Sequence, residues 1–597
     1  MLPDKIKERI VRSLAREFCR TIIFSFTTAA TVLYTPNDLP NPETFLLEPF
    51  GDDKIYLLVR KWREIGNGQN GEMSDEVILQ SHEKILLLFS QTEVQKFPYD
   101  AVTLLELLDS SVGGDIAPSS FASCYEALIQ RRLIGKGFKP GQHDEGKNFL
   151  SLVAYRAYCE NQSGVISKDG FAECVDIFVD QYFSSAASLK KMSIANFLIK
   201  EGGTYRFSED YLWYFLCARY VGKTLVQHDQ EKYHAFIAHC ASNIFQKRYA
   251  NIIIYLAYFT DDNAVIKALM ALLDRLFAKA DDWTLSDKSR SIILGLAGSD
   301  ELSISSSSEV EEKRLLLMKE SVRDVINNAE DVVARYTLPF LDPHIEDSEL
   351  IDEIDTNEID GDSYMKSVNA LLRTHSVVGQ ILNGRAGTYG APLIMECIAK
   401  MVQASGRYAS LNHAIATILI FDPDMAEYSA STVLKIEDMT SEEKRKKIVR
   451  IFAFWSVYLS QTGLARYLSQ EHSMRALERL AEKFEHEKDD HGHYPYNFTS
   501  VLLIARLYES GKIDKAGIEA AISKYGSESS IFAIIRVTIF MYSYYMPMSI
   551  KDKQWVAVRL GIPVRAIEMQ KVRAENAVQM DKKLLLNINP NSKDDIG

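Results

Sequence analysis

The sequence lacks the paired cysteines that mark a disulfide framework or a zinc site. Its seven cysteines contain no C-x-x-C spacing, and most stand inside apolar helical patterns. Reduced, buried thiols of this kind are typical of an intracellular protein. The opening residues MLPDKIKERIVRSLAREFCR also lack the apolar segment and cleavage site of a signal peptide. We therefore expect a cytoplasmic location.

Long uncharged apolar runs are missing as well. The most apolar segment, IFAIIRVTIFMYSYYMPM (531–548), contains Arg536, Pro547 and several tyrosines. A charged side chain at the centre of a lipid bilayer is costly, so this segment is better explained as a helix buried in protein. We expect no membrane partner. A chain of 597 residues is too long for one hydrophobic core and should contain several cooperative units.

The sequence has fewer basic than acidic residues, 68 against 81. The net charge is −13 and the sequence pI is about 5.6, which disfavours general binding to nucleic acid. The segment 343–362 carries nine carboxylates without a Lys or Arg, so much of this charge is local. It is not a calcium loop, because Thr356 and Ser367 stand where the EF-hand pattern needs Asp and Glu.

Recognisable catalytic motifs are absent: the sequence has no G-x-S-x-G elbow and no kinase signature. Gly222-Lys223-Thr224 matches the end of a phosphate-binding loop, but Cys217 stands where the first glycine of G-x-x-x-x-G-K-[ST] is required. The intervening residues continue a helical pattern that begins near Asp210. Helix interior offers no free N–H groups for a phosphate, so we interpret these residues as helix.

The cluster FEHEKDDHGHYPY (484–496) is the one candidate for a metal site. It contains His486, His491 and His493 together with two aspartates, and these are residue types that bind zinc. Two of the histidines flank a glycine in a pattern typical of a loop, and the H-E-x-x-H spacing is missing. We favour a solvated charged loop and expect no metal, with the three histidines as weak candidates.

Hydrophobic periodicity predicts a mainly helical protein. Apolar residues recur every three or four positions through most of 74–570, and Asp52 has the position of a helix cap. Strands are predicted only at 21–26, 44–50 and 204–207. Helices are predicted at 74–95, 98–110, 119–135, 148–161, 170–183 and 188–200. A further helix is predicted from Asp210, and one helix follows another beyond 229, including the segment 248–262.

The order of these elements resembles the C-terminal half of STAND-type P-loop NTPases, the group that includes NACHT and NLR-like proteins. The segment FSEDYLWYFLCARY (207–220) is similar to the end of the winged-helix region in that family. Its pattern, F-x-H-x-x-x-x-E/Y-F-x-A-x-Y, is matched at Phe207, Tyr214, Phe215, Ala218 and Tyr220.

Other segments share the resemblance. TFLLEPFGDDKIYLLVRKW (44–62) resembles the last strand and helix of the NTPase domain, and KFPYDAVTLLELLDSS (96–111) resembles the lid segment whose proline, here Pro98, packs near adenine. APSSFASCYEALIQRRL (117–133) and RYANIIIYLAYFTDD (248–262) look like segments that follow in bacterial members. The resemblance covers roughly residues 20–265.

The departures from the family concern the nucleotide. No Walker A loop or acidic Walker B strand precedes residue 20, and the family's phosphate-sensing histidine aligns with Glu209. A carboxylate repels a phosphate instead of donating a hydrogen bond to it. The resemblance thus implies Pro98 and Glu209 as cofactor-binding positions, with ATP or ADP bound only if a separate NTPase core is supplied.

The resemblance also implies the division of the chain. We expect a fold that is mainly α, with a small α/β remnant, a helical lid, a winged-helix-like unit and an irregular, solenoid-like helical region. The boundaries are 1–73 (partial α/β), 74–137 (lid), 138–228 (winged-helix-like), 229–342 (helical lobe), 343–365 (acidic linker), 366–572 (C-terminal lobe) and 573–597 (tail).

Two functions remain open. The first is a truncated or split STAND protein that acts as a signalling or antiphage-defence sensor and binds a protein trigger or an effector chain; an oligomer is compatible with it. The alternative is a nucleotide-independent α-helical scaffold. An enzyme would have only the 486–493 cluster to use, so we expect no catalysis from this chain alone. A coding sequence with G-x-x-x-x-G-K-[ST] next to Met1 would separate the first two.

Overall fold

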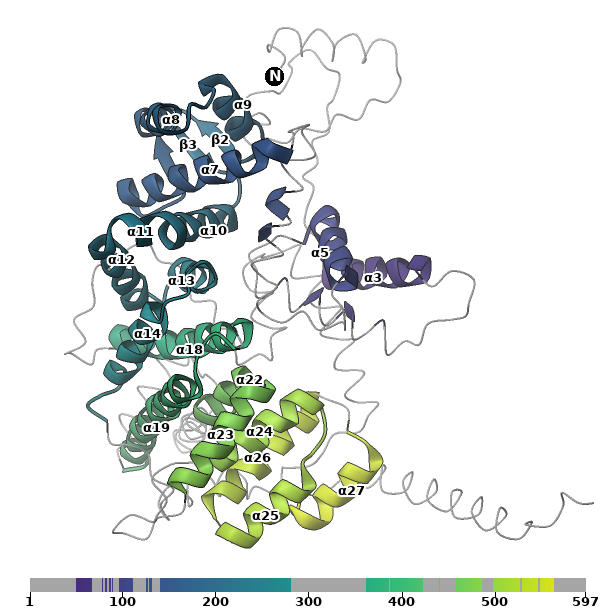
Figure 1. Ribbon diagram of the computed structural model, residues 1–597. Coiled ribbons are helices and arrows are strands. Elements are labelled where there is room, and N and C mark those ends of the chain that lie inside the picture. The colour runs from purple at the N-terminus through teal and green to yellow at the C-terminus, as the bar shows by residue number, and fades with distance from the viewer. Residues whose placement is uncertain are drawn as a thin grey trace, which may run out of the picture. The chain divides into compact units, whose positions relative to one another are not determined.

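A computed structural model describes residues 50–66, 96–110, 140–280, 361–385, 387–421, 440, 458–485, 498–526, 529–545 and 548–562, with a few single positions between 78 and 130. These residues are predominantly helical, which confirms a mainly α protein (Figure 1). The chain divides into two units, 1–50 and 51–597. Apart from Phe50, the described residues all belong to the second unit, and the strands predicted at 21–26 and 44–50 otherwise lie outside them.

The described elements are, in chain order, α3 (Asp52–Gly66), α5 (Pro98–Ser110), α7 (Pro140–Asn161), β1 (Val165–Ser167), α8 (Lys168–Tyr182), α9 (Ala186–Asn196), β2 (Leu198–Glu201), β3 (Thr204–Phe207), α10 (Asp210–Tyr220), the π-helical turn η1 (Val221–Leu225), α11 (Val226–His228), α12 (Gln230–Ser242), α13 (Lys247–Phe259), α14 (Ala264–Arg275), α18 (Gly361–Gly384), α19 (Ala391–Phe421), the π-helical turn η3 (Tyr458–Gly463), α22 (Leu464–Tyr467), α23 (Glu471–Phe484), α24 (Phe498–Ser510), α25 (Lys515–Tyr525), α26 (Ser530–Tyr545) and α27 (Ile550–Arg559).

Helix α3 packs against α5. It begins at Asp52, whose buried carboxylate lies 2.5 Å from the Nζ atom of Lys96. At the other end of α3, Trp62 and Arg63 both donate hydrogen bonds to the carboxylate of Asp109 in α5. These contacts join α3 to a helix that the sequence analysis assigned to the next domain, across the boundary predicted at 73.

A small antiparallel sheet lies between helices in the region 140–207. Its strand order is β1-β3-β2, with Val165 opposite Arg206 and Leu198 opposite Phe207. Helix α7 packs against β1, α8 and α9. Ser167 ends β1 and caps α8, because its Oγ atom accepts a hydrogen bond from the backbone N–H of Gly170.

The structure corrects the predicted strands in this region. The strand at 204–207 is confirmed, but β1 and β2 were missed, and the helix predicted for 188–200 ends at Asn196. Strands of three and four residues are too short to show an alternating pattern. The turn at Gly202, where φ is +57°, folds β2 back onto β3. Helix α7 also begins at Pro140, before the predicted start at 148.

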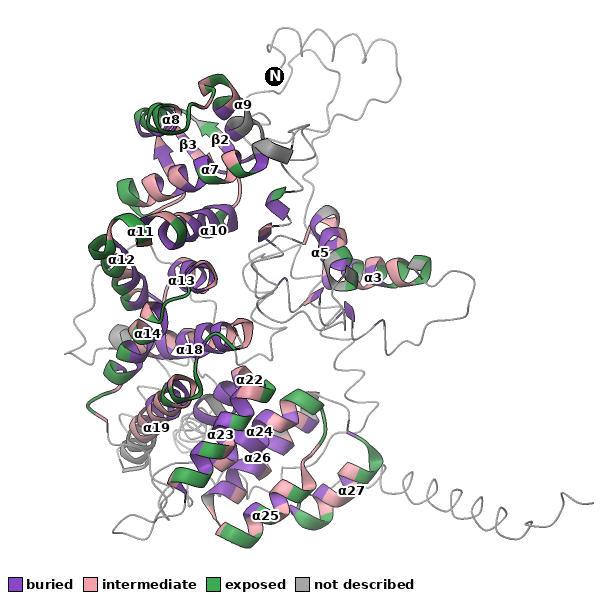
Figure 2. Ribbon diagram, in the orientation of Figure 1, coloured by how far each residue is buried: buried purple, intermediate pink, exposed green. Residues whose placement is uncertain are grey.

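Helix α10 is enclosed by other elements. Every residue from Tyr211 to Arg219 is buried, and the helix packs against α7 on one side and α13 on another. A helix that is apolar nearly all round must be covered on all faces, as this one is (Figure 2).

The helices before and after the acidic segment pack directly on each other: α13 against α18, and α14 against α19. Arg385, just after α18, donates to the carbonyls of Tyr258 and Thr260 at the end of α13, and Arg407 of α19 donates to the carbonyl of Leu273 in α14. Helix α18 begins at Gly361, so the predicted linker 343–365 runs into this helix and its boundary at 365 is corrected.

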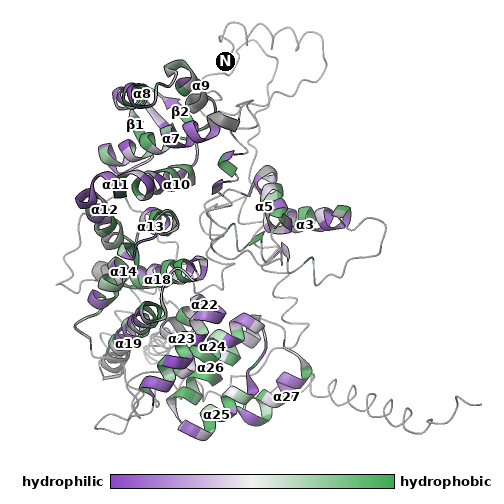
Figure 3. Cartoon of the chain, viewed as in Figure 1, coloured by the Kyte–Doolittle hydropathy of each residue, from purple (hydrophilic) through white to green (hydrophobic). Residues whose placement is uncertain are grey.

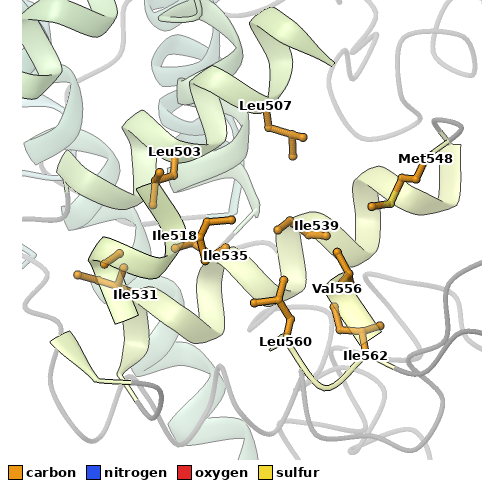
Figure 4. Close-up of a cluster of buried hydrophobic side chains, with 11 residues drawn as sticks. Leu503, Leu507, Ile518, Ile531, Ile535, Ile539, Met548, Val556, Leu560 and Ile562 are labelled. Atoms are coloured by element: carbon orange, nitrogen blue, oxygen red, sulfur yellow. The ribbon is translucent and has the colours of Figure 1, made fainter. Parts of the chain in front are cut away.

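The C-terminal helices α24 to α27 share one hydrophobic cluster (Figure 4). Helices α24 and α26 are largely hydrophobic (Figure 3). The cluster consists of Leu503, Leu507, Ile518, Ala521, Ile531, Ile535, Ile539, Met548, Val556, Leu560 and Ile562. This confirms the prediction of a buried helix within 531–548. Across the described ranges, no helix combines the length and apolar character needed to span a membrane.

Candidate functional site

The residues predicted from the family resemblance lie on different helices. Pro98 is the first residue of α5, and Glu209 occupies the N-cap position of α10 without a side-chain capping bond. His486, His491 and His493 lie outside the described residues. Within the part of the chain that the structure covers, no group of three His, Cys, Asp or Glu residues could hold a metal ion.

Gly222-Lys223-Thr224 is part of a helix, as the sequence analysis inferred. Cys217 lies buried within α10, and the three residues continue that helix as η1. Gly222 is needed here for a close contact: a Cβ atom at this position would lie 2.7 Å from the Cβ atom of Phe259 in α13. The GKT sequence thus permits α13 to approach the helix, and no glycine-rich phosphate loop is formed.

Aromatic side chains fill the space around α10. Tyr211 and Phe215 of α10 meet Tyr125, Tyr255 and Phe259, with ring centroids 4.9 to 5.9 Å apart in the contacting pairs. Their tilted and edge-on arrangements are the ones that aromatic pairs favour. The aromatic residues of α10 therefore close a hydrophobic core with those of the neighbouring helices.

Four of the five described cysteines are buried. Cys174, Cys217, Cys240 and Cys397 are buried, and burial raises the pKa of each thiol above its ordinary value. Cys159 is exposed, which differs from the sequence-based expectation, yet its pKa is raised too, chiefly by burial of the sulfur. The thiolate is the reactive form, so a raised pKa lowers the reactive fraction of each thiol at neutral pH.

Arg219 is a buried charged residue in the last turn of α10. It is 8% exposed. Its Nη1 atom donates to Asn148 Oδ1 at 2.7 Å and to Ser151 Oγ at 3.4 Å, whereas its Nε atom is buried without an acceptor. Both partners are neutral, and no described carboxylate forms an ion pair with it. Burial lowers the pKa of Arg219, although guanidinium stays protonated at any ordinary pH.

Two lysines lie in the electrostatic neighbourhood of Arg219. Lys223 follows it by one helical turn, and Lys147 lies on the facing helix α7. Burial lowers the pKa of Lys223, and the positive charges of Arg219 and Lys147 lower it further. Glu126 and Asp144 oppose this shift, but Asp144 is exposed and pairs with Lys147 at 3.0 Å.

The outer face of α8 differs in character. Much of α8 is exposed (Figure 2). Four carboxylates share one side of the helix, and Ile177, Tyr182 and the C-cap residue Phe183 are exposed to solvent. The four acidic residues are Asp169, Glu173, Asp176 and Asp180. Phe183 is 95% exposed and has a φ of +53°, a conformation that a bulky residue seldom adopts. Exposed apolar groups rimmed by charge are typical of protein-binding surfaces.

A shallow groove of about 420 Å³ lies between α23, α24 and the start of α25. Arg506 occupies its wall and bonds to Glu478 and to Asp514, the second at 2.6 Å. These ion pairs join α23, α24 and the start of α25, so we assign the groove a structural role.

Sequence reasoning missed the position of Arg219. The available signal was a single charged residue, four positions before Lys223, within an otherwise apolar helix. Comparison of the chain with family models, with curated proteins and with solved structures finds no match. The assignment of a function therefore depends on the residues and their geometry.

Proposed function

We propose that the chain carries the lid, winged-helix-like and sensor regions of a STAND-type NTPase and serves in signalling or antiphage defence. One observation carries the proposal. Residues 140–207 follow the order helix, strand, helix, helix, strand, strand, with the first strand beside the last in the sheet. This order, with a β-hairpin after a compact helical unit, supports a winged-helix-like fold for the region.

The charges of this unit favour a protein partner over nucleic acid. Residues 138–228 contain ten Lys and Arg against ten Asp and Glu, and the exposed side of α8 is acidic. Proteins that bind DNA through winged helices neutralise phosphates with a basic surface. The balance of charge therefore supports packing against protein, with the exposed Phe183 as an anchor.

The helices after residue 229 support the sensor part of the proposal. The described helices pack on one another in succession, α12 on α14, α14 on α19, α19 on α23 and α23 on α24. This succession supports a solenoid-like region, and solenoids offer extended surfaces for binding other proteins. A trigger protein or an effector chain is the partner that we propose for them.

Under this proposal, the chain binds a nucleotide only together with a separate NTPase core. The sequence holds no G-x-x-x-x-G-K-[ST], and its GKT lies in η1, where backbone N–H groups are already bonded. In an assembled protein, Pro98 would face the adenine side of the site and Glu209 would replace the family's histidine. A carboxylate there would weaken contact with a nucleotide phosphate.

The test is reconstitution with the product of the coding sequence next to Met1. If that product contains the Walker motifs, we expect it to copurify with this chain and to hydrolyse ATP in the complex. Substitution of its Walker lysine should abolish hydrolysis, while this chain alone should remain inactive. A Walker-containing product that neither binds this chain nor changes its activity would contradict the proposal.

The second candidate is an α-helical scaffold that uses no nucleotide. It is favoured by the aromatic packing around α10 and by the arginine contacts that join α13 and α14 to α18 and α19. These contacts favour one fixed arrangement over a switch. A scaffold would bind its partner equally well with and without ATP and the core, whereas a sensor would respond to them.

A further inference from the structure

Two helices, α3 and α8, expose large apolar side chains that the rest of the chain does not cover. On α3, Leu57 is 53% exposed and Ile65 is 80% exposed. On α8 and its C-cap, Ile177, Tyr182 and Phe183 are exposed. Five of the seven large hydrophobic side chains exposed in the described part of the chain thus belong to these two helices, which marks both as surfaces for binding protein.

The outer stripe of α8 is acidic. It carries four exposed carboxylates, those of Asp169, Glu173, Asp176 and Asp180. Residues three, four and seven positions apart lie on one side of a helix, so these charges form a single row. Glu173 pairs with Arg156 at 2.7 Å, but Asp176 and Asp180 form no hydrogen bond or ion pair with another described residue. This row is suited to a basic partner and repels nucleic acid.

The outer stripe of α3 is basic. It consists of Lys54, Leu57, Lys61 and Ile65, at positions three and four residues apart. Arg60 and Glu64, at the edge of the stripe, form an ion pair with each other, so their charges cancel. Lys61 is exposed and forms no hydrogen bond or ion pair with another described residue. Helix α3 therefore presents positive and apolar groups together, which complements the acidic and apolar surface of α8.

We propose that α3 of one copy of this chain binds α8 of a second copy, with Lys61 of the first opposite Asp180 of the second. The inference rests on the part of the proposed function that assigns the α8 surface to protein binding, and it names the partner; it requires no nucleotide. Both side chains of the pair are exposed and lack a described partner in their own copy, so neither has an existing contact to break.

The apolar residues match in the same register. On α3, the lysine of the proposed pair lies midway between Leu57 and Ile65, four residues from each. On α8, the aspartate lies midway between Ile177 and Phe183, three residues from each. When the two helices run parallel, each apolar residue of α3 therefore lies within one position of an apolar residue of α8. The ion pair then lies between two apolar contacts.

Phe183 supports a contact with another molecule. Its φ is +53°, in the left-handed region where a helix C-terminus favours glycine and a bulky residue is strained. Its side chain is 95% exposed, so it buries too little apolar surface within its own copy to offset that strain. Binding to a second copy would bury the ring and make Phe183 an anchor of the interface.

The test is the mass of the full chain in solution, measured without any NTPase core by sedimentation equilibrium at concentrations up to about 100 μM. We expect a monomer of 67.6 kDa on dilution and a dimer or larger assembly as the concentration rises. Lys61→Glu and Asp180→Lys should each weaken association about tenfold, because like charges then face each other. The protein with both substitutions should regain the original affinity, since opposite charges again lie across the interface.

Phe183→Gly separates association from folding. Glycine relieves the strained φ, so this variant should keep or exceed the melting temperature of the unaltered chain, while its association weakens about tenfold or more. Lys551→Glu, at an exposed position of α27, is the matched control and should leave association unchanged. The proposal is overturned if the unaltered chain stays a monomer at every concentration, or if the doubly substituted protein associates no better than either single variant. Either result leaves the reconstitution with a Walker-containing product as a separate test of the proposed function.

Discussion

Acid should destabilise this protein through one buried histidine, His375 of α18. The side chain has no exposed surface, and its Nε2 atom lies 3.2 Å from Ser405 Oγ in α19. Burial lowers the pKa of His375 from 6.5 to about 3, and the backbone at Met401 offsets only part of that shift. The folded protein therefore keeps this imidazole neutral in mildly acidic solution, where the unfolded chain protonates it.

The sign and size of the effect follow from proton linkage. Above pH 6.5 both states hold the imidazole neutral, so the contribution of His375 to stability is fully present. Between pH 6.5 and 3 only the unfolded state takes up the proton, and the free energy of unfolding falls by about 1.4 kcal/mol per pH unit. At pH 5, which lies well inside this window, the loss amounts to about 2 kcal/mol.

The assay compares urea unfolding at pH 7.5 and pH 5 for the unaltered chain and for His375→Gln. Other titrating groups contribute equally to both proteins, so the difference between the two pH effects isolates His375. We expect the variant to lose about 2 kcal/mol less than the unaltered chain on acidification. His234→Gln, at an exposed position, is the control. If His375→Gln shows the same acid sensitivity as the unaltered chain, His375 is not held neutral by burial.

Three further substitutions test the packing. Gly222→Leu should destabilise by about 1–3 kcal/mol in urea unfolding, because its side chain would overlap α13, whereas Gly203→Leu, which meets open space, should change stability by about 0.5 kcal/mol or less. Arg385→Ala removes the hydrogen-bond donors to the last carbonyls of α13, so it should lower the free energy of unfolding by about 1–3 kcal/mol and speed up hydrogen exchange at the end of that helix. Arg475→Ala, which breaks an exposed ion pair, is the control, and an equal effect from it would refute the explanation. Glu485→Ala should lower the free energy of unfolding by about 1–3 kcal/mol, because this buried carboxylate accepts hydrogen bonds from Thr499 of α24 and Tyr525 of α25. An unchanged urea midpoint would show that these hydrogen bonds do not stabilise the fold.

Several elements could be predicted from the sequence because their signals are local. The Asp at residue 52 places the start of α3, and Pro98 places the start of α5. The apolar periodicity of α10, α13 and α26 is long enough to indicate helices, and their nearly uniform hydrophobicity indicates burial. A phosphate-binding loop depends on residue types at fixed spacing, so Cys217 in place of the required glycine was sufficient to reject one.

Other features depend on partners that are distant in the chain, so only the tertiary structure decided them. Strands β1 and β2 are too short to carry a period and exist because β3 pairs with both. Helices α13 and α18 meet across about a hundred residues of sequence, through Arg385 and two carbonyls that no pattern identifies. In the sequence, Arg219 is a charged residue in a predicted helix. Only the tertiary structure shows that α7 covers it and supplies neutral hydrogen-bond partners. Local spacing determines which segments are helical, whereas the cost of burying an unpaired charge arises only when those segments pack.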